Sequence, residues 1–255
     1  MLSHRLVPDS NGLYDPVNMP LLHHVNQALK AHVLYHRLAL DRAMGVYDRE
    51  RFLAYLKLPR FQPYMAKAWN ERRESQDYPA HLNADFAPRT LLPIVNADEE
   101  LVRSYLKHFF IDAAGILEFA TYVDNTYLEH LFAETKVENG LGDPEAWASK
   151  LPPELFARLR DRIDIDFAPT NKTDFTADET VKLDLFVKNV PTLLVKVFEV
   201  NAKNYYRTRQ KEVDTDLNLD GLVPNAEQTH KYGESPLRRV GRTFELPQQI
   251  GRAHV

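Results

Sequence analysis

The sequence contains no cysteine. This excludes disulfides, thiolate nucleophiles and cysteine-ligated zinc sites, but it does not identify a compartment, because many exported bacterial proteins also lack cysteine. Glycine is scarce, with Gly 9 in 255 residues, and forms neither a G-x-G-x-x-G motif nor a phosphate loop. No serine lies in a G-x-S-x-G context. We therefore predict no catalytic residue, no metal ligand and no cofactor.

Long apolar runs and a basic excess are also missing. No segment approaches the roughly 18 apolar residues of a membrane helix, and the N-terminus has no apolar run of signal-peptide length. The net charge of −4 argues against nucleic acid as a partner. A composition of 44% hydrophobic and 27% charged residues is typical of a globular protein. We expect protein partners or neighbouring domains of the same chain, without membrane insertion.

Residues 16 to 162 have the spacing of amphipathic helices. The first helix is expected within residues 19–44, and Asp48 is a good N-cap for the second. Asn96 is expected to open a later helix, with Glu99 in the position of its capping-box partner. The apolar stripe of the first helix is expected to contain Leu22, Val25, Leu29, Val33, Leu40 and Met44.

The last helices of this region carry clear start and stop signals. Gly140 is expected to end one helix. Asp143-Pro144 begins the next with an N-cap and a first-turn proline, and Pro152-Pro153-Glu154 begins another. Residues 1–162 are therefore predicted to form an all-α helical domain.

The pattern changes after Arg162. Residues 163–201 are rich in β-branched and aromatic residues, and residues 181–188 alternate between two faces. We predict an α+β protein in which the helical domain is followed by a truncated antiparallel β-sandwich, of immunoglobulin or macroglobulin type, over residues 163–249. One face of its first long strand is expected to carry Val181, Leu183, Leu185 and Val187.

The final residues, Ile250–Val255, read IGRAHV. Reverse translation as ATC-GGA-AGA-GCA-CAC-GTC gives the start of a widely used sequencing adapter, so residues 250–255 are expected to be an artefact. The protein is then expected to continue past Gln249, and the sandwich to lack its last strands. Exposed edge strands and apolar surface are expected near Val195, Phe198 and Phe244.

The stretch Asp214–Glu227 reads DTDLNLDGLVPNAE and fits the calcium-loop template D-x-[DN]-x-[DN]-G-x5-E. An EF-hand also needs an apolar helix on each side, and neither flank has an apolar stripe. Val213, Thr215, Leu217 and Leu219 alternate with polar residues, which favours a half-buried strand ending in an Asp-Gly turn. A calcium-binding module remains an alternative. Its ligand positions would be Asp216, Asn218, Asp220 and Glu227, with Gly221 at the turn.

His32 and His36 have the i, i+4 spacing of zinc proteases. Val33 occupies the position of the glutamate base, so partly exposed helix histidines are favoured. A hydrolase with its active site in the helical half, or outside this sequence, remains an alternative. It predicts a pocket that gathers one of these histidines with two acidic side chains.

Two further motifs have simple interpretations. The basic residues Lys231, Arg238, Arg239 and Arg242 favour a solvated strand face over a nucleic-acid patch. Asn171-Lys172-Thr173 is a glycosylation sequon, which has meaning only in a eukaryotic secreted chain.

The stretch PTNKTDFTADETVKLDLFVKNVPTLLVKVFEVNAKNYYR resembles a macroglobulin-type sandwich. The resemblance implies a strand entered through Glu179-Thr180-Val181 and a paired strand from Leu193 to Asn201. With FAETK at residues 132–136, GLGD at 140–143 and DTDLNLDGLVPN, the chain also resembles very long multidomain proteins that have no assigned activity. This implies an exported or envelope-facing location. The chain has neither a bait segment nor a Cys-Gly-Glu-Gln thioester, so protease trapping does not carry over.

These observations favour a non-enzymatic scaffold or interaction module that is a fragment of a larger, macroglobulin-like multidomain protein. The hydrolase and the calcium-binding module remain the alternatives.

Overall fold

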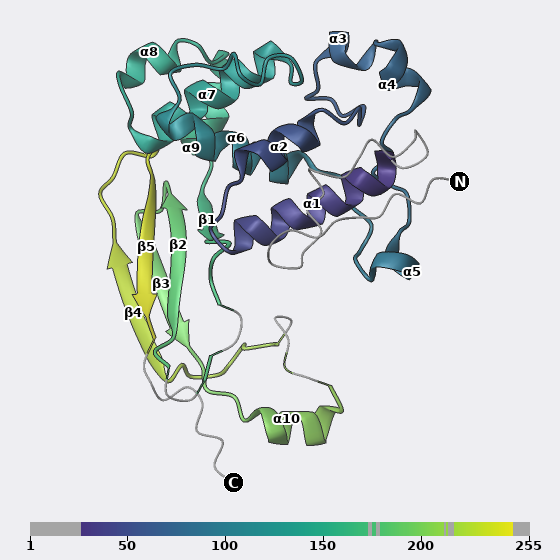
Figure 1. Ribbon diagram of the computed structural model, residues 1–255. Helices are drawn as coiled ribbons and strands as arrows, with labels where there is room; N and C mark the ends of the chain where they lie inside the picture. Colours follow the sequence, from purple (N-terminus) through teal and green to yellow (C-terminus); the bar gives the residue numbers. More distant parts are fainter. Residues whose placement is uncertain (1–26, 173–174, 177–178, 212, 214–216, 247–255) are drawn as a thin grey trace. The chain divides into compact units, whose positions relative to one another are not determined.

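The computed structural model describes residues 27–172, 175–176, 179–211, 213 and 217–246. Helices come first and two antiparallel sheets follow, which confirms the predicted α+β fold (Figure 1). The chain divides into two compact units, Met1–Phe156 and Ala157–Val255. The division at residue 162 stays a prediction. The expected artefact, residues 250–255, lies outside the described residues.

The first unit is helical, and aspartate side chains cap three of its helices. Asp48, Asp124 and Asp143 each accept a backbone N–H in the first turn of a helix. Gly140 ends a helix with φ 62°, a left-handed conformation that favours glycine. The helices are α1 (Gln27–Ala43), α2 (Arg49–Leu56), α3 (Lys67–Asn70), α4 (Arg73–Asp77), α5 (Ala87–Thr90), α6 (Glu99–Asp112), α7 (Asn125–Asn139), α8 (Pro144–Ala148) and α9 (Pro153–Asp161), of which α9 crosses into the second unit.

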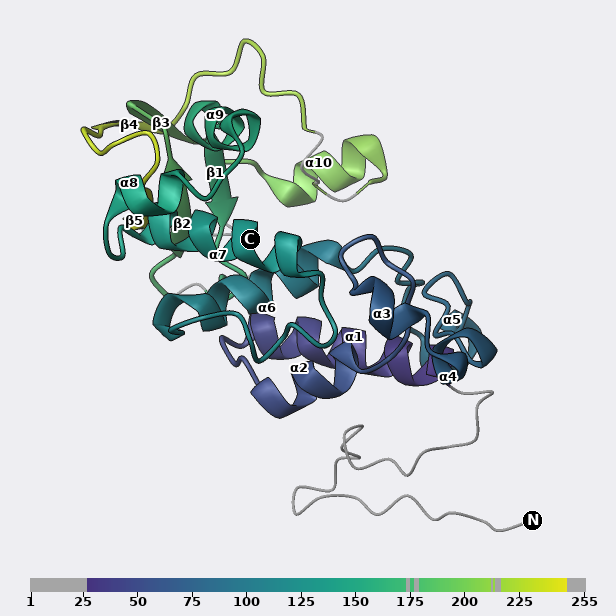
Figure 2. The ribbon, with the colours of Figure 1, turned by 90° about the horizontal axis from the view of Figure 1, so that it is seen from above.

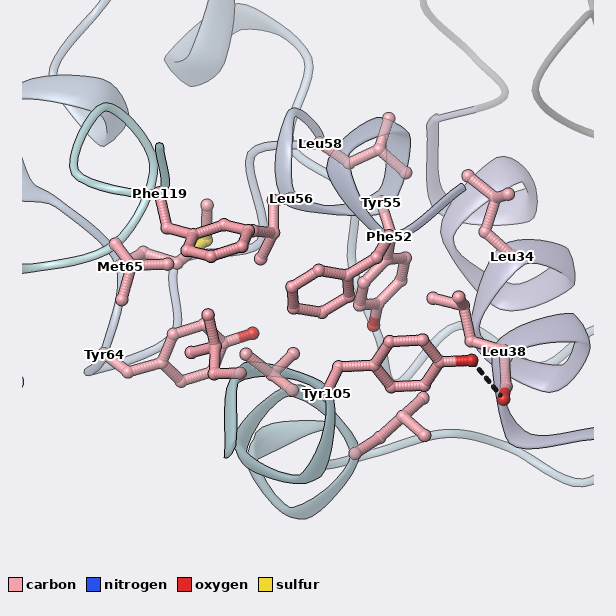
Figure 3. Packing of buried hydrophobic residues seen from close by; sticks show 14 of the residues in the cluster. Leu34, Leu38, Phe52, Tyr55, Leu56, Leu58, Tyr64, Met65, Tyr105 and Phe119 are labelled. Carbon is pink, nitrogen blue, oxygen red and sulfur yellow. Dashed lines mark hydrogen bonds between the residues drawn. The ribbon is translucent and has the colours of Figure 1, made fainter. Parts of the chain in front are cut away.

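The core of the helical unit lies where α1, α2 and α6 pack side by side (Figure 2). Phe52 of α2 stacks on Tyr105 of α6 with ring centroids 5.0 Å apart. The Tyr105 hydroxyl donates to the Leu38 carbonyl of α1 at 2.9 Å (Figure 3). This contact satisfies a hydroxyl that the apolar cluster encloses, and it joins α6 to α1.

Two helix predictions were wrong. The predicted stripe residues Leu22 and Val25 lie outside the described residues. The buried face of α1 contains Ala31, Leu34 and Leu38, whereas Leu40 and Met44, just past the helix, are 51% and 56% exposed. Both sets of positions have helical spacing, and only the position of α2 and α6 decides between them. Asn96 does not cap α6. Its φ is 56°, and Asp98 holds the cap position without a capping hydrogen bond.

The second unit contains two sheets. One has the order β1 (Asp164–Phe167), β2 (Lys182–Lys188), β5 (Arg239–Glu245), and the other pairs β3 (Thr192–Val197) with β4 (Ala226–Lys231); all pairings are antiparallel. The predicted pairing of the strand at 193–201 with its predecessor was wrong, since β3 ends at Val197 and joins the other sheet. The chain passes from the first sheet to the second through residues 189–191, where Asn189 has a φ of 55° and Pro191 precedes β3.

The predicted alternation of β2 is confirmed for the buried Leu185 and Val187 and the exposed Lys182 and Asp184. It was wrong for Lys188, which is buried. The inner faces of the two sheets meet where the His230 ring of β4 contacts Phe244 of β5, with centroids 4.9 Å apart. The outer face is polar, and the Thr243 hydroxyl contacts the Asp184 carboxylate across it at 2.5 Å.

The predicted exposed apolar surface is confirmed in part, since Leu194 and Val200, beside the named residues, are exposed. Phe244 is buried, and Val195 and Phe198 are half-buried. Ile165 and Phe167 of β1 are instead 48% and 65% exposed, although their partners on β2 are buried. In the described chain the second sheet has two strands, and it does not cover β1.

No helix among the described residues has both the length and the apolar character needed to cross a membrane.

Candidate functional site

The two helix histidines hold a loop in place. His32 is buried, and its Nε2 lies 3.0 Å from the Thr90 hydroxyl. His36 Nε2 donates to the Pro93 carbonyl at 2.9 Å, and the two imidazole centroids are 4.6 Å apart. The prediction of partial exposure was therefore wrong for His32. Burial and the neighbouring His36 lower the pKa of His32. His32 joins α1 to the end of α5, and His36 joins it to the segment that follows, so both have a structural role.

No set of three metal-ligating side chains gathers around these histidines or anywhere else in the described ranges. The hydrolase alternative predicted two acidic side chains beside one histidine. The acidic group that influences His32 is Asp85, which raises the pKa against the larger effect of burial.

Part of the calcium-loop match lies within the described residues, and Asp216 lies outside them. The predicted Asp-Gly turn is confirmed: Gly221 has φ 80°, and the Leu222 N–H donates to the Leu219 carbonyl at 3.1 Å. The predicted strand is wrong for residues 217–219, which have no regular structure, and Leu219 is exposed.

The side chains of Asn218 and Glu227, two of the predicted calcium ligands, contact other groups of the protein. The Asn218 side-chain oxygen accepts the Asp220 N–H at 2.8 Å, as in an Asx-turn. Glu227 lies on β4, with its carboxylate 3.9 Å from Lys196. The incoming flank is helical, contrary to prediction: α10 (Ala202–Arg209) begins at Asn201, whose side chain accepts the Asn204 N–H. No residue of α10 is buried, which is why an apolar stripe could not reveal it.

The C-terminal basic residues belong to the sandwich surface. Arg239 lies 3.2 Å from the Asp166 carboxylate and stacks over Phe186 at 4.1 Å. Arg242 pairs with Glu234 and stacks over Tyr232. These contacts agree with the predicted strand face.

The helical unit contains a fully buried ion pair. Arg60 Nε donates to Asp98 Oδ2 at 2.8 Å, and the side chains of both are fully buried. The same oxygen accepts the hydroxyls of Tyr55 at 2.8 Å and Tyr64 at 2.7 Å. Burial lowers the pKa of Arg60, but Tyr64, Tyr55 and Asp98 outweigh it, and the pKa lies above its ordinary value. Burial raises the pKa of Tyr64. The cluster therefore holds a charged arginine and two neutral tyrosines.

This cluster fixes the chain that leaves α2. Arg60 Nη1 donates to the Leu58 carbonyl at 3.1 Å and also to the Tyr55 carbonyl. The Ala80 N–H donates to the Pro59 carbonyl at 2.8 Å, which attaches the segment after α4 to the same place. These hydrogen bonds hold the backbone of Leu58 and Pro59 in position.

Leu58 and Pro59 line a cleft of about 670 Å³. The volume is within the range of roughly 300–1,000 Å³ found for ligand sites. Trp69 of α3 and Tyr122 contribute an aromatic surface, with edge-to-face rings 4.6 Å apart. The Ala66 N–H donates to the Tyr122 carbonyl at 2.9 Å, and the Ser75 hydroxyl donates to the Trp69 carbonyl at 2.8 Å. Backbone and side-chain bonds therefore hold both rings in position.

The cleft is also charged. Lys30, Lys57 and Arg72 line it, together with Glu50 and Glu74. Burial and the neighbouring Lys57 lower the pKa of Lys30. Arg72 lies over the Trp69 ring at 3.9 Å. Sequence reasoning missed this site, because its residues come from separate helices and form no motif.

Comparison with protein families identifies the helical region. Residues 20–163, more than half of the chain, match the model described as the actin-binding protein F N-terminal domain. The chain belongs to this family. Residues 193–254 match a second model, the AbpF first immunoglobulin-like domain. The immunoglobulin-like match agrees with the predicted sandwich at the level of fold.

A curated relative supports the same family. The chain is 31% identical over 222 residues to actin-binding protein F of Dictyostelium discoideum, which covers 86% of this chain and 9% of that protein. Two short matches are SecA protein translocase subunits, 54% identical over 33 residues in Variovorax paradoxus (strain S110) and 59% over 32 in Orientia tsutsugamushi (strain Ikeda). Each covers 4% of the SecA protein and carries no argument about this chain. No solved structure matches the chain.

The segment FAETK at residues 132–136 has structural roles within the family's N-terminal domain. Glu134 on α7 pairs with Arg103 and Lys107 of α6, the latter at 2.9 Å. Lys136 Nζ donates to the Ile111 carbonyl at 2.9 Å and the Ala113 carbonyl at 3.0 Å, at the C-terminus of α6. The segment therefore fastens α6 to α7.

Proposed function

We propose that this chain is a non-enzymatic interaction module that binds actin through its helical domain. The observation that carries the proposal is the match of residues 20–163 to the actin-binding protein F N-terminal domain. The relative with 31% identity has actin binding in its name. Because the chain spans 9% of that relative, the whole protein's activity comes to this chain only as a proposal.

Co-sedimentation tests this function. The full chain is centrifuged with and without filamentous actin over a range of actin concentrations. We expect saturable transfer of the chain to the pellet when actin is present, and no transfer without it. A chain that stays in the supernatant at every actin concentration overturns the proposal.

Three further features remain separate proposals: a macroglobulin-type sandwich, an exported location and calcium binding. The immunoglobulin-like match supports a sandwich and leaves its macroglobulin character untested. An exported or envelope-facing location likewise stays a proposal. The calcium alternative is decided by titration calorimetry with calcium, comparing the wild-type chain with the D216A/D220A variant. Heat release in the wild type alone favours a site, and no heat in either ends that idea.

A further inference from the structure

We infer that the cleft between α1, α2 and the α3–α4 segment binds an acidic segment of the protein partner. In this mode, carboxylates of the segment meet Lys30 and Lys57, and an apolar side chain packs on Trp69 and Tyr122. The inference rests on the proposed function and assigns the partner contact to one surface of the helical domain.

The first argument is the pair of lysines. Lys30 is half-buried, and Lys57 is close enough to lower its pKa. Among the described residues, neither lysine forms an ion pair. Glu50 and Glu74 line the same cleft without bridging to them. Two like charges held together in a partly buried site raise the energy of the free protein, and a carboxylate that enters between them lowers it.

The second argument is the aromatic surface. Trp69 and Tyr122 are both half-buried, and the Trp69 indole contacts both the Tyr122 ring and the Arg72 guanidinium. Aromatic and arginine side chains in a rigid, partly enclosed site are the residues on which binding energy concentrates. The cleft thus combines an apolar surface with three cations and two carboxylates, an excess of positive charge.

The third argument is hydrogen bonding. Trp69 Nε1 and Gln27 Oε1, from two residues that line the cleft, have no hydrogen-bond partner within the described chain. Buried polar atoms are normally paired, and an unpaired one destabilises a folded protein. The indole N–H can donate to a carboxylate or carbonyl of the bound segment.

Charge reversal tests the inference in the full chain. The K30E/K57E variant is expected to bind filamentous actin at least about tenfold more weakly than the wild type, because the cleft now repels an acidic segment. The matched control is K203E/R207E, which reverses two exposed charges on α10 and changes the net charge equally. The control is expected to retain wild-type affinity. Circular dichroism of the variants verifies folding.

The outcomes separate the two proposals. If K30E/K57E is folded and binds actin as the wild type does, the cleft is not the contact and the inference is wrong, while actin binding stands. If the wild type itself does not bind actin, the proposed function fails. A titration with a glutamate-rich peptide, monitored by tryptophan emission, then tests whether the cleft binds an acidic segment independently of actin. We expect a change in the wild type and none in K30E/K57E, and no change in either overturns the inference.

Discussion

At the scale of single residues, the helical unit contains a fully buried ion pair, Arg60–Asp98. Arg60 and Asp98 are both completely enclosed, and the Arg60 guanidinium lies 4.0 Å from the Tyr55 ring centroid. The free energy lost by removing two ions from water is offset only where several hydrogen bonds replace it. Asp98 receives three such bonds on one oxygen. Asp98 also holds the cap position of α6, where its side chain makes no capping hydrogen bond.

Replacement of Arg60 by methionine is predicted to destabilise the protein by about 3–5 kcal/mol, because it leaves a buried carboxylate without its cation. Urea denaturation measures the change. The control is Arg73→Met, which removes a cation of the exposed pair with Asp77. An R60M variant as stable as R73M would contradict this account of the cluster.

At the scale of elements, a lysine in each unit donates hydrogen bonds to carbonyls at the C-terminus of a helix. Lys136 donates to carbonyls at the C-terminus of α6, and Lys188 donates to the Leu159 and Arg162 carbonyls at the end of α9. A cation at a helix C-terminus satisfies orphan carbonyls and interacts favourably with the helix dipole. Asn189 adds bonds to the Arg160 and Asp161 carbonyls, both at 3.2 Å. Side chains at the end of β2 therefore hold the last turn of α9.

Lys188→Met is predicted to destabilise the sandwich unit by roughly 1–3 kcal/mol, because buried carbonyls lose a charged donor. Lys182→Met, on the exposed end of the same strand, is the matched control and is expected to change stability little. Thermal unfolding followed by circular dichroism compares the two. Equal losses would show that Lys188 contributes no more than a surface charge.

The contact between α6 and α7 is expected to depend on pH. Burial raises the pKa of Glu134, but Lys107 and Arg103 outweigh it and lower the pKa to about 2, against an ordinary value of 4.5. A folded-state pKa below the unfolded value stabilises the fold above the unfolded pKa, and this contribution is lost as the pH falls.

Wild type is therefore predicted to be more stable than the Glu134→Gln variant at neutral pH, and the difference is predicted to shrink between pH 4.5 and about 2. Urea denaturation of both proteins across this range measures the difference. A difference that stays constant with pH would contradict an ionic role for Glu134.

At the scale of the whole molecule, local signals predicted some element boundaries and missed others, such as α10. Asp48 and Asp143 as caps, Gly140 as a stop and the inward face of β2 were readable because each depends on neighbours in sequence. The buried face of α1 and the partner of β3 were not, because distant segments decide them. The candidate cleft could not be predicted, since Lys30, Trp69 and Tyr122 meet only after folding.

The strand order has a practical consequence for anyone who isolates the immunoglobulin-like part. The family match to that domain begins at residue 193, yet β2, which ends at Lys188, lies between β1 and β5 in the sheet. A fragment that starts at residue 193 would leave β5 without its hydrogen-bonding neighbour and Phe244 without the strand beside it. Such a fragment would present two unpaired strand edges to other molecules and would be prone to aggregate. An expression boundary before residue 153 keeps the whole sheet together with α9, the helix that β2 caps.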